Sequence, residues 1–191
     1  MSNQETKTLA SEIKTQVTIL GSFVTLMWVL EIVDVFVFRQ GLNVYGILPR
    51  EIIGLRGILF APFLHGGFAH LISNTIPFLL LGWFVMLQET SEFFIVTPII
   101  MLVSGLGGWL LGAPGLHIGA SGVIFGYLGF LLARGFFERN FPSILLSLIV
   151  GSLYGGLIWG VLPIQPGVSW EGHLFGFIGG VLAARFLAGQ K

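Results

Sequence analysis

Apolar residues occur along the chain in long runs, which charged residues, prolines and glycines separate from one another. A helix needs about 20 mostly apolar residues to cross the hydrocarbon core of a bilayer. Six runs approach this length, at residues 17–38, 69–87, 93–111, 119–134, 143–162 and 170–187. The pattern predicts an all-α membrane protein with six transmembrane helices, preceded by a short polar segment at residues 1–16.

The connection between the first two runs, residues 39–68, is long and rich in glycine, proline and phenylalanine. It is too apolar for a solvated loop and too broken for a span, so we expect it to lie in the membrane interface. The other connections are short, which favours one compact bundle over residues 17–191. Glu31 and Asp34 share one helical face and either line a polar cavity or approach the outer surface; we favour the surface position.

Composition supports a membrane protein, since 54% of the residues are hydrophobic and only 9% are charged, against about 25% charged residues in soluble domains. Nine basic and nine acidic residues cancel, so nucleic acid is not expected as a partner. The chain has no cysteine, which excludes disulfides and thiol catalysis. No small-residue cleavage site follows the polar opening, so we expect the first apolar run to stay attached.

Lysine and arginine predict the orientation, because cytoplasmic loops carry an excess of both. An even number of spans places both termini on one side. If that side is the cytoplasm, it holds Lys7, Lys14, Arg134, Arg139, Arg185 and Lys191, which leaves Arg39, Arg50 and Arg56 outside. We therefore expect a multi-pass protein of the cell membrane with cytoplasmic N and C termini.

Polar side chains inside apolar spans cost free energy and are therefore candidates for function. Asn74, Ser121 and His173 are such residues, and each precedes the polar end of its span by 12 to 14 residues. At about 1.5 Å per residue, all three lie roughly 18–21 Å above the cytoplasmic boundary. That is about 10 Å below the outer face of a core about 30 Å thick. Three helices would thus deliver an amide, a hydroxyl and an imidazole to one level.

Ser121 lies in the segment Gly119-Ala-Ser-Gly122, where a loop turns into an apolar helix. A serine there is either a helix cap or a nucleophile whose proton a histidine accepts. The shared depth with His173 favours the nucleophile, and Gly119 allows the backbone to approach another group closely. Glu171 is two residues from His173, so it points away along the helix and is not assigned as a third member.

Attack on a carbonyl also requires hydrogen-bond donors for the oxyanion. Asn74 can supply its amide, and His70, one helical turn nearer the outer surface, can supply a second donor. We expect His65 and His117 to hydrogen-bond water. The chain has no His-Glu-x-x-His metal motif, and Asp34 is its only aspartate. Metal-dependent hydrolysis and aspartyl proteolysis are therefore not indicated.

Three segments resemble the rhomboid family of intramembrane serine proteases in its basic six-span form. They are His65-Gly-Gly-Phe-Ala-His70-Leu-Ile-Ser-Asn74, Gly119-Ala-Ser-Gly122 and Gly172-His173-Leu-Phe-Gly176-x3-Gly180. The resemblance covers nearly the whole chain after residue 15. It implies Ser121 as nucleophile, His173 as general base, and His70, Asn74 and the Ser121 backbone as oxyanion donors, with no metal or other cofactor. The implied substrate is the membrane helix of another protein, cut near the outer face.

Several positions depart from the common pattern of the family. Phe125 stands where many rhomboids have a tyrosine packed on the catalytic histidine, so stacking can survive without the hydroxyl. Leu55-Arg56 stands in place of Trp-Arg, and Gly172 in place of alanine. Phe125 and Gly119 are candidate positions for substrate contact or gating beside the dyad.

Small residues one helical turn apart predict that the fourth and sixth spans approach closely. A leucine on these stripes should separate the spans, and an alanine should do less harm. The stripes are Gly122-x3-Gly126 and Gly172-x3-Gly176-x3-Gly180. The fifth span is a candidate for the side that moves to admit substrate, because it carries Gly151, Gly155, Gly156 and Gly160.

Two other functions compete with proteolysis. A noncatalytic membrane adaptor of rhomboid-like fold predicts loss of the serine or the histidine, and both are present. A small transporter predicts internal sequence symmetry, which the sequence lacks. The sequence therefore favours an intramembrane serine endopeptidase, whose partners are transmembrane protein substrates and the lipid bilayer.

Overall fold

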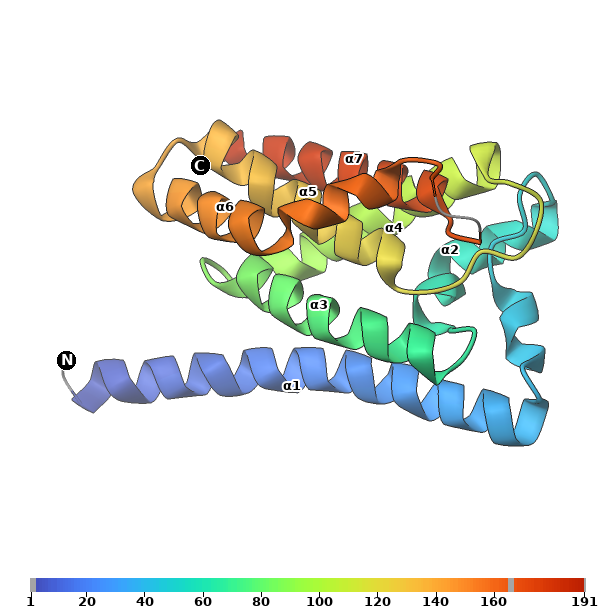
Figure 1. The fold of residues 1–191 in the computed structure, drawn as a ribbon. Helices are drawn as coiled ribbons and strands as arrows, with labels where there is room; N and C mark the ends of the chain where they lie inside the picture. Colours follow the sequence, from blue (N-terminus) through green and yellow to red (C-terminus); the bar gives the residue numbers. More distant parts are fainter. Residues whose placement is uncertain (1–2, 165–166, 191) are drawn as a thin grey trace.

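The computed structural model describes residues 3–164 and 167–190, which form six long helices and a group of short helical turns (Figure 1). The long helices are α1 (Asn3–Val33), α3 (Phe68–Met86), α4 (Glu92–Leu111), α5 (Ser121–Glu138), α6 (Phe141–Tyr154) and α7 (Trp170–Ala188). Each predicted apolar run overlaps one of them, although α1 begins earlier because the polar segment before residue 17 is also helical. Among the described residues, β-type pairing is limited to one bridge between Ile47 and His117. The all-α class is confirmed.

Four helical segments of the described residues are long and apolar enough to cross a membrane, as expected of an integral membrane protein. They are Lys7–Phe38, Phe68–Met86, Glu92–Leu111 and Phe141–Val161. The helices α5 and α7 have 18 and 19 residues but are not among the four, because glycines and polar residues lower their mean hydropathy. The predicted count of six spans therefore stays a prediction.

The helices α5 and α7 form the most extensive contact between any two elements of the bundle, whereas α1 lies at its edge against α3 (Figure 1). Glycines set the distance between α5 and α7. A Cβ atom at Gly176 would overlap the main-chain oxygen of Gly122, and one at Gly180 would overlap that of Gly126. The close approach predicted from the glycine stripes is confirmed. A side chain at Gly126 would instead meet Ile100 of α4.

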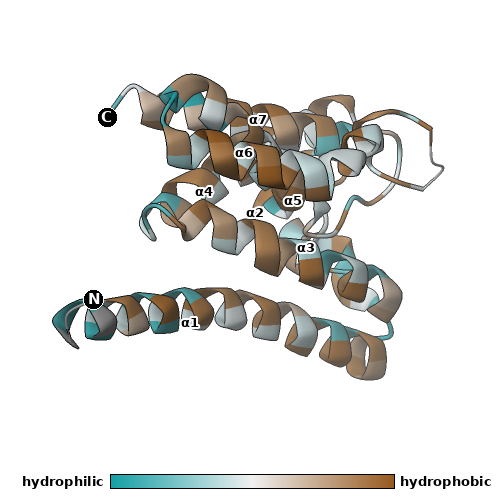
Figure 2. Ribbon diagram, turned by 60° about the vertical axis from the view of Figure 1, so that its left-hand side comes forward, coloured by the Kyte–Doolittle hydropathy of each residue, from teal (hydrophilic) through white to brown (hydrophobic). Residues whose placement is uncertain are grey.

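Short helical turns connect α1 to α3 at one end of the bundle (Figure 1). They are a π-helical turn (Asp34–Phe38), three 3-10 turns (Gly41–Tyr45, Ile52–Arg56 and Ala61–Phe63) and the short helix α2 (Gly57–Phe60). Many apolar side chains of this connection are exposed, among them Ile52 at 82%. In Figure 2, much of α3 and α6 has the colour of hydrophobic residues, and hydrophilic residues occur near the chain ends. The exposed apolar side chains of the connection suit the position in the membrane interface that was predicted for residues 39–68.

Glu31 and Asp34 differ from the expected surface position, because each is only 2% exposed. Oδ1 of Asp34 accepts a hydrogen bond from the main-chain N–H of Leu42 at 2.8 Å. The main-chain oxygen of Asp34 accepts another from the N–H of Gln40 at 2.9 Å. Both bonds close the turn in which Arg39 and Gln40 have φ angles of 52° and 65°. The buried carboxylate of Asp34 thus fixes the direction in which the connection leaves α1.

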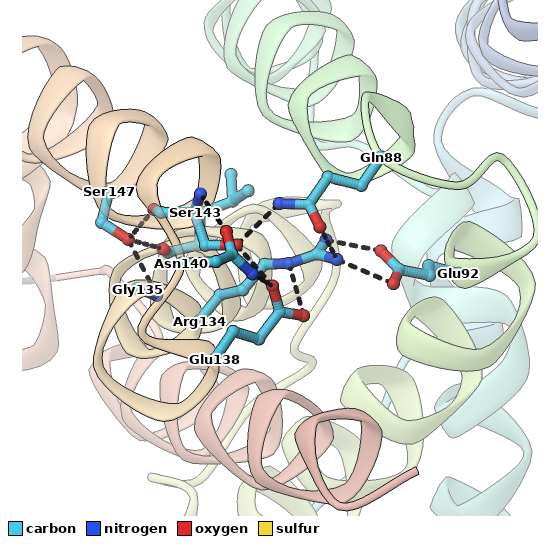
Figure 3. A network of polar contacts seen from close by, with 9 residues as sticks. Gln88, Glu92, Arg134, Gly135, Glu138, Asn140, Ser143 and Ser147 are labelled. Atoms are coloured by element: carbon cyan, nitrogen blue, oxygen red, sulfur yellow. Dashed lines mark hydrogen bonds and ion pairs between the residues drawn. The ribbon is translucent and has the colours of Figure 1, made fainter. Parts of the chain in front are cut away.

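A buried polar network around Arg134 holds the opposite end of the bundle (Figure 3). The guanidinium donates to both carboxylate oxygens of Glu92, at 2.5 and 2.8 Å, to Glu138 at 3.0 Å and to Gln88 at 2.6 Å. Ser143 at the start of α6 also donates to Glu138. The network ties α4 and α6 to the last turns of α5, the helix that begins with Ser121.

Candidate active site

Ser121 and His173 meet although they are 52 residues apart in the chain. Ser121 is the first residue of α5, and His173 lies in the first turn of α7. Nε2 of His173 is 2.8 Å from Oγ of Ser121, and His173 is 7% exposed. The N-cap of α5 is Ala120, so the interpretation of Ser121 as a helix cap is wrong.

Two further groups hold the imidazole of His173. The ring of Phe125 is stacked on it, with centroids 4.0 Å apart and planes 7° apart, so the contact expected from a family tyrosine is present without the hydroxyl. Nδ1 of His173 is 2.9 Å from the main-chain oxygen of Gly160. Sequence reasoning missed this role of Gly160, because every residue has a main-chain carbonyl and none signals its use.

His70 and Asn74 lie one turn apart on α3 and face Gly119. A Cβ atom at Gly119 would be 2.7 Å from Nε2 of His70 and 3.8 Å from Nδ2 of Asn74. Gly119 also has a φ angle of +115°, which residues with side chains rarely adopt. Only glycine therefore allows the backbone to pass so close to His70, two residues before Ser121.

The hydrogen bonds of His70 and Asn74 leave a donor on each side chain. The main-chain N–H of Gly66 is 3.4 Å from Nδ1 of His70, and since an N–H only donates, the neutral ring carries its proton on Nε2. Nδ2 of Asn74 donates one hydrogen to the main-chain oxygen of His70 at 3.0 Å and keeps a second. Both donors lie beside Gly119, and such donors are what an oxyanion requires.

A cavity of about 40 Å³ adjoins the dyad. It is lined by Ser121, His173 and Gly119, and also by Ser104, His117 and Ser169. A water molecule needs roughly 10–15 Å³ of such space, so the cavity has room for one. His70, Asn74 and Phe125 are not among its lining residues, so the two predicted side-chain donors for the oxyanion stand outside this cavity.

Two histidines differ from the expectation that they bond water. Nδ1 of His117 is 2.6 Å from Oγ of Ser169, and its Nε2 is 2.8 Å from the main-chain oxygen of Ala113. His117 therefore joins the loop before α5 to the start of α7. His65 is 1% exposed and lies edge-on to His70, with ring centroids 5.1 Å apart. Burial, and secondly the charge of His70, lowers the pKa of His65 to about 4.

Two side chains that the sequence did not assign to the site complete its surroundings. Oγ of Ser104, on α4, donates to the main-chain oxygen of Gly172 at 2.8 Å. Glu171 is buried and accepts a hydrogen bond from the N–H of Ala113 at 3.0 Å. Both contacts anchor the first turn of α7, which carries His173.

Comparison with known proteins adds an independent observation. A family model described as the Rhomboid domain matches residues 54–190. An uncharacterised protein of Mycobacterium tuberculosis is 43% identical over 183 residues, covering 91% of this chain and 76% of that protein. A second uncharacterised protein, of Mycobacterium leprae, is 41% identical over 184 residues, covering 92% and 72% respectively. RHOMBOID-like protein 4 of Arabidopsis thaliana is 34% identical over 136 residues, covering 65% of this chain and 32% of that protein.

Proposed function

This chain belongs to the rhomboid family, and we propose on that premise that it is an intramembrane serine endopeptidase with a Ser121–His173 dyad. Family membership supports an intramembrane-protease-like function in general. The observation that carries the dyad is the 2.8 Å contact between Oγ of Ser121 and Nε2 of His173 at a buried position. A hydroxyl paired with an imidazole in this way is the arrangement that activates a serine nucleophile.

In the proposed reaction, Oγ of Ser121 attacks the carbonyl carbon of the scissile bond while its proton passes to Nε2 of His173. The tetrahedral intermediate then collapses, the C–N bond breaks, and His173 gives the proton to the leaving amine. A water molecule loses a proton to His173 and attacks the acyl-enzyme. The second product then leaves, and Ser121 regains its proton. The cavity beside the dyad suits this water.

The proposed oxyanion donors are Nε2–H of His70, the free amide hydrogen of Asn74 and the main-chain N–H of Ser121. The position of His70 and Asn74 against Gly119 supports the first two. Ser121 begins α5, and the first N–H groups of a helix have no partner within it, which supports the third. Phe125 and Gly119 would then act beside the dyad, Phe125 by holding His173 and Gly119 by opening a path to the donors.

We further propose a six-span topology with cytoplasmic termini, in which the dyad lies about 10 Å below the outer face of the cell membrane. The start of α5, the start of α7 and the turn that carries His70 meet at one end of the bundle, which supports a single depth. The charge count behind the orientation includes Lys191, which lies outside the described residues. Substrate helices reach such a site sideways from lipid, and the partners are transmembrane proteins and the bilayer.

The function is tested with purified protein in liposomes that contain a labelled single-span substrate. Ser121→Ala and His173→Ala should each abolish cleavage, and the double variant should be no worse than either, because the two residues act as one unit. Ser22→Ala is the matched control, since the Ser22 hydroxyl bonds only within α1, to Thr18. A fluorophosphonate should label Ser121 only while His173 is intact. Full cleavage by His173→Ala would overturn the dyad, and full cleavage by Ser121→Ala would overturn the proposed protease.

A second experiment tests the position of the cut. A substrate helix has its carbonyls bonded within the helix, so a turn or more must unwind before Ser121 reaches one. Substrates with glycine or proline in the outer third of the span should be cut there, near a small residue, because these are weak helix formers. A uniform leucine helix of equal length should resist. Mass spectrometry maps the cuts, and cuts in the cytoplasmic half of the span would contradict the topology.

A further inference from the structure

Both nitrogens of the His173 imidazole have a partner, and the two partners differ in chemistry. Nδ1 is 2.9 Å from the main-chain oxygen of Gly160, and Nε2 is 2.8 Å from Oγ of Ser121. A carbonyl oxygen only accepts, so Nδ1 carries a hydrogen. The neutral ring has a single N–H, which leaves a lone pair on Nε2. That lone pair faces the hydroxyl whose proton it would accept.

The absence of a side chain at Gly160 also matters for the ring stack on His173. It lies in the 3-10 segment Gly155–Val161 that continues α6. A Cβ atom at position 160 would be 2.5 Å from Cζ of Phe125 and 3.5 Å from Nδ1 of His173. Since Phe125 is stacked on His173 at 4.0 Å, a side chain at Gly160 would disturb that stack. The ring of His173 is thus held on its face by Phe125 and at its edge by the Gly160 carbonyl.

The segment that carries this carbonyl is poorly packed. None of the residues Gly155–Val161 is buried, and Trp159 is 65% exposed. Cβ atoms at Gly155 and Gly156 would meet nothing within 4 Å. By contrast, Ser121 and His173 stand on α5 and α7, the most extensively packed pair of helices. The third partner of His173 is therefore on a segment that has no buried residue of its own.

We propose that Gly160 is a positioning residue, whose main-chain carbonyl holds His173 in the tautomer that can accept the serine proton. The inference rests on the proposed protease function and adds to it. When the segment Gly155–Val161 moves away, His173 loses the partner that selects Nδ1–H. The ring then also populates the Nε2–H form, which cannot accept a proton from Ser121. Activity is thereby coupled to the position of this segment, in addition to any effect on substrate access.

An amide-to-ester replacement tests the carbonyl without changing a side chain. Replacing Val161 by its α-hydroxy acid makes the Gly160 carbonyl an ester carbonyl, which is a weaker acceptor. We expect kcat to fall about two- to tenfold, the range of one hydrogen bond, with KM little changed. The ester between Leu157 and Ile158 is the control, because it also removes an N–H from the same 3-10 segment but leaves Gly160 intact.

The spectroscopic readout is the ¹⁵N spectrum of histidine-labelled protein, in which His173 is assigned by its absence from the His173→Ala spectrum. The ester at Gly160 should lower the Nδ1–H population of His173, and the control ester should not. Gly160→Ala should do the same and lower kcat about tenfold or more, because its Cβ displaces Phe125. Gly108→Ala on α4 is its control, since a Cβ added there also meets nothing within 4 Å and lies outside the segment Gly155–Val161.

The two proposals fail in different ways. If the Gly160 ester keeps both the wild-type kcat and the wild-type Nδ1–H signal, the positioning role is wrong even though Ser121→Ala is inactive. A fall in kcat without a change of tautomer would also overturn it, because the ester would then act only on packing. If Ser121→Ala cleaves normally, the protease proposal is wrong, whatever the tautomer of His173.

Discussion

Replacing Gly176 by alanine tests most directly whether helix packing sets the geometry of the dyad. Gly176 lies on α7 three residues after His173, and a Cβ atom there would overlap the main-chain oxygen of Gly122, next to Ser121. The overlapped atom belongs to the backbone, so no side-chain rotation relieves it. The structure therefore changes the expectation from sequence that alanine would do little harm on this stripe: α5 and α7 must separate where the dyad forms.

The size of the effect follows from the 2.8 Å contact between Ser121 and His173. Moving the two helices apart by about 1 Å stretches this contact beyond hydrogen-bonding distance. Misplacement on that scale costs about 10²-fold in rate. Forcing an extra methyl into a packed core also costs about 1–3 kcal/mol in the free energy of unfolding. We expect the loss of unfolding free energy for Gly176→Ala to approach about 3 kcal/mol, because the added Cβ strains main chain against main chain.

The assay measures kcat for a single-span substrate in liposomes, together with the thermal midpoint of the protein in detergent. Gly108→Ala is the matched control, because Gly108 is a buried glycine of α4 whose added Cβ would meet nothing within 4 Å. Its rate should be unchanged, and its stability equal or slightly higher, since alanine favours a helix over glycine by about 1 kcal/mol. Wild-type kcat and thermal midpoint for Gly176→Ala would refute the argument that this contact sets the dyad.

Three further predictions concern other parts of the bundle. Asn74→Ala and His70→Ala should each lower kcat about 10²-fold with KM little changed, in single-turnover cleavage; an Asn74→Ala protein that unfolds, yet is fully active per folded molecule, would make Asn74 structural. Arg134→Met should lower the free energy of unfolding by about 3–5 kcal/mol, because it removes the cation that pairs with the buried carboxylates of Glu92 and Glu138. Adding Glu92→Met should restore part of that loss, and a double variant as unstable as the single would contradict this reason. Burial lowers the pKa of His65 from 6.5 to about 4, so the folded state favours the neutral ring, and stability should be full above pH 6.5 and fall between pH 6.5 and 4. His65→Phe should remove this part of the acid sensitivity in unfolding measured across pH, and an unchanged pH dependence would assign it to other groups.

Local composition was enough to predict the helices and several close contacts. Apolar runs determine where helices form, because in a membrane a helix satisfies its own backbone hydrogen bonds. The glycine stripes predicted the approach of α5 and α7, since small residues one turn apart leave a groove for a neighbouring helix. The depth argument predicted that Ser121 and His173 share one level, and the structure places them 2.8 Å apart. Their catalytic roles stay predictions, as do those of His70 and Asn74.

Tertiary structure alone decided which groups surround these residues. Glu31 and Asp34 are buried because the connection after α1 folds back over them, and a helical spacing cannot show that. His117 bonds Ser169 rather than water because two loops distant in sequence meet beside the dyad. The partner of Nδ1 of His173 is the Gly160 carbonyl, a group identical in every residue, so no side-chain pattern marks it. Sequence determines what each segment can form by itself, whereas contacts between segments depend on where the folded backbone brings them together.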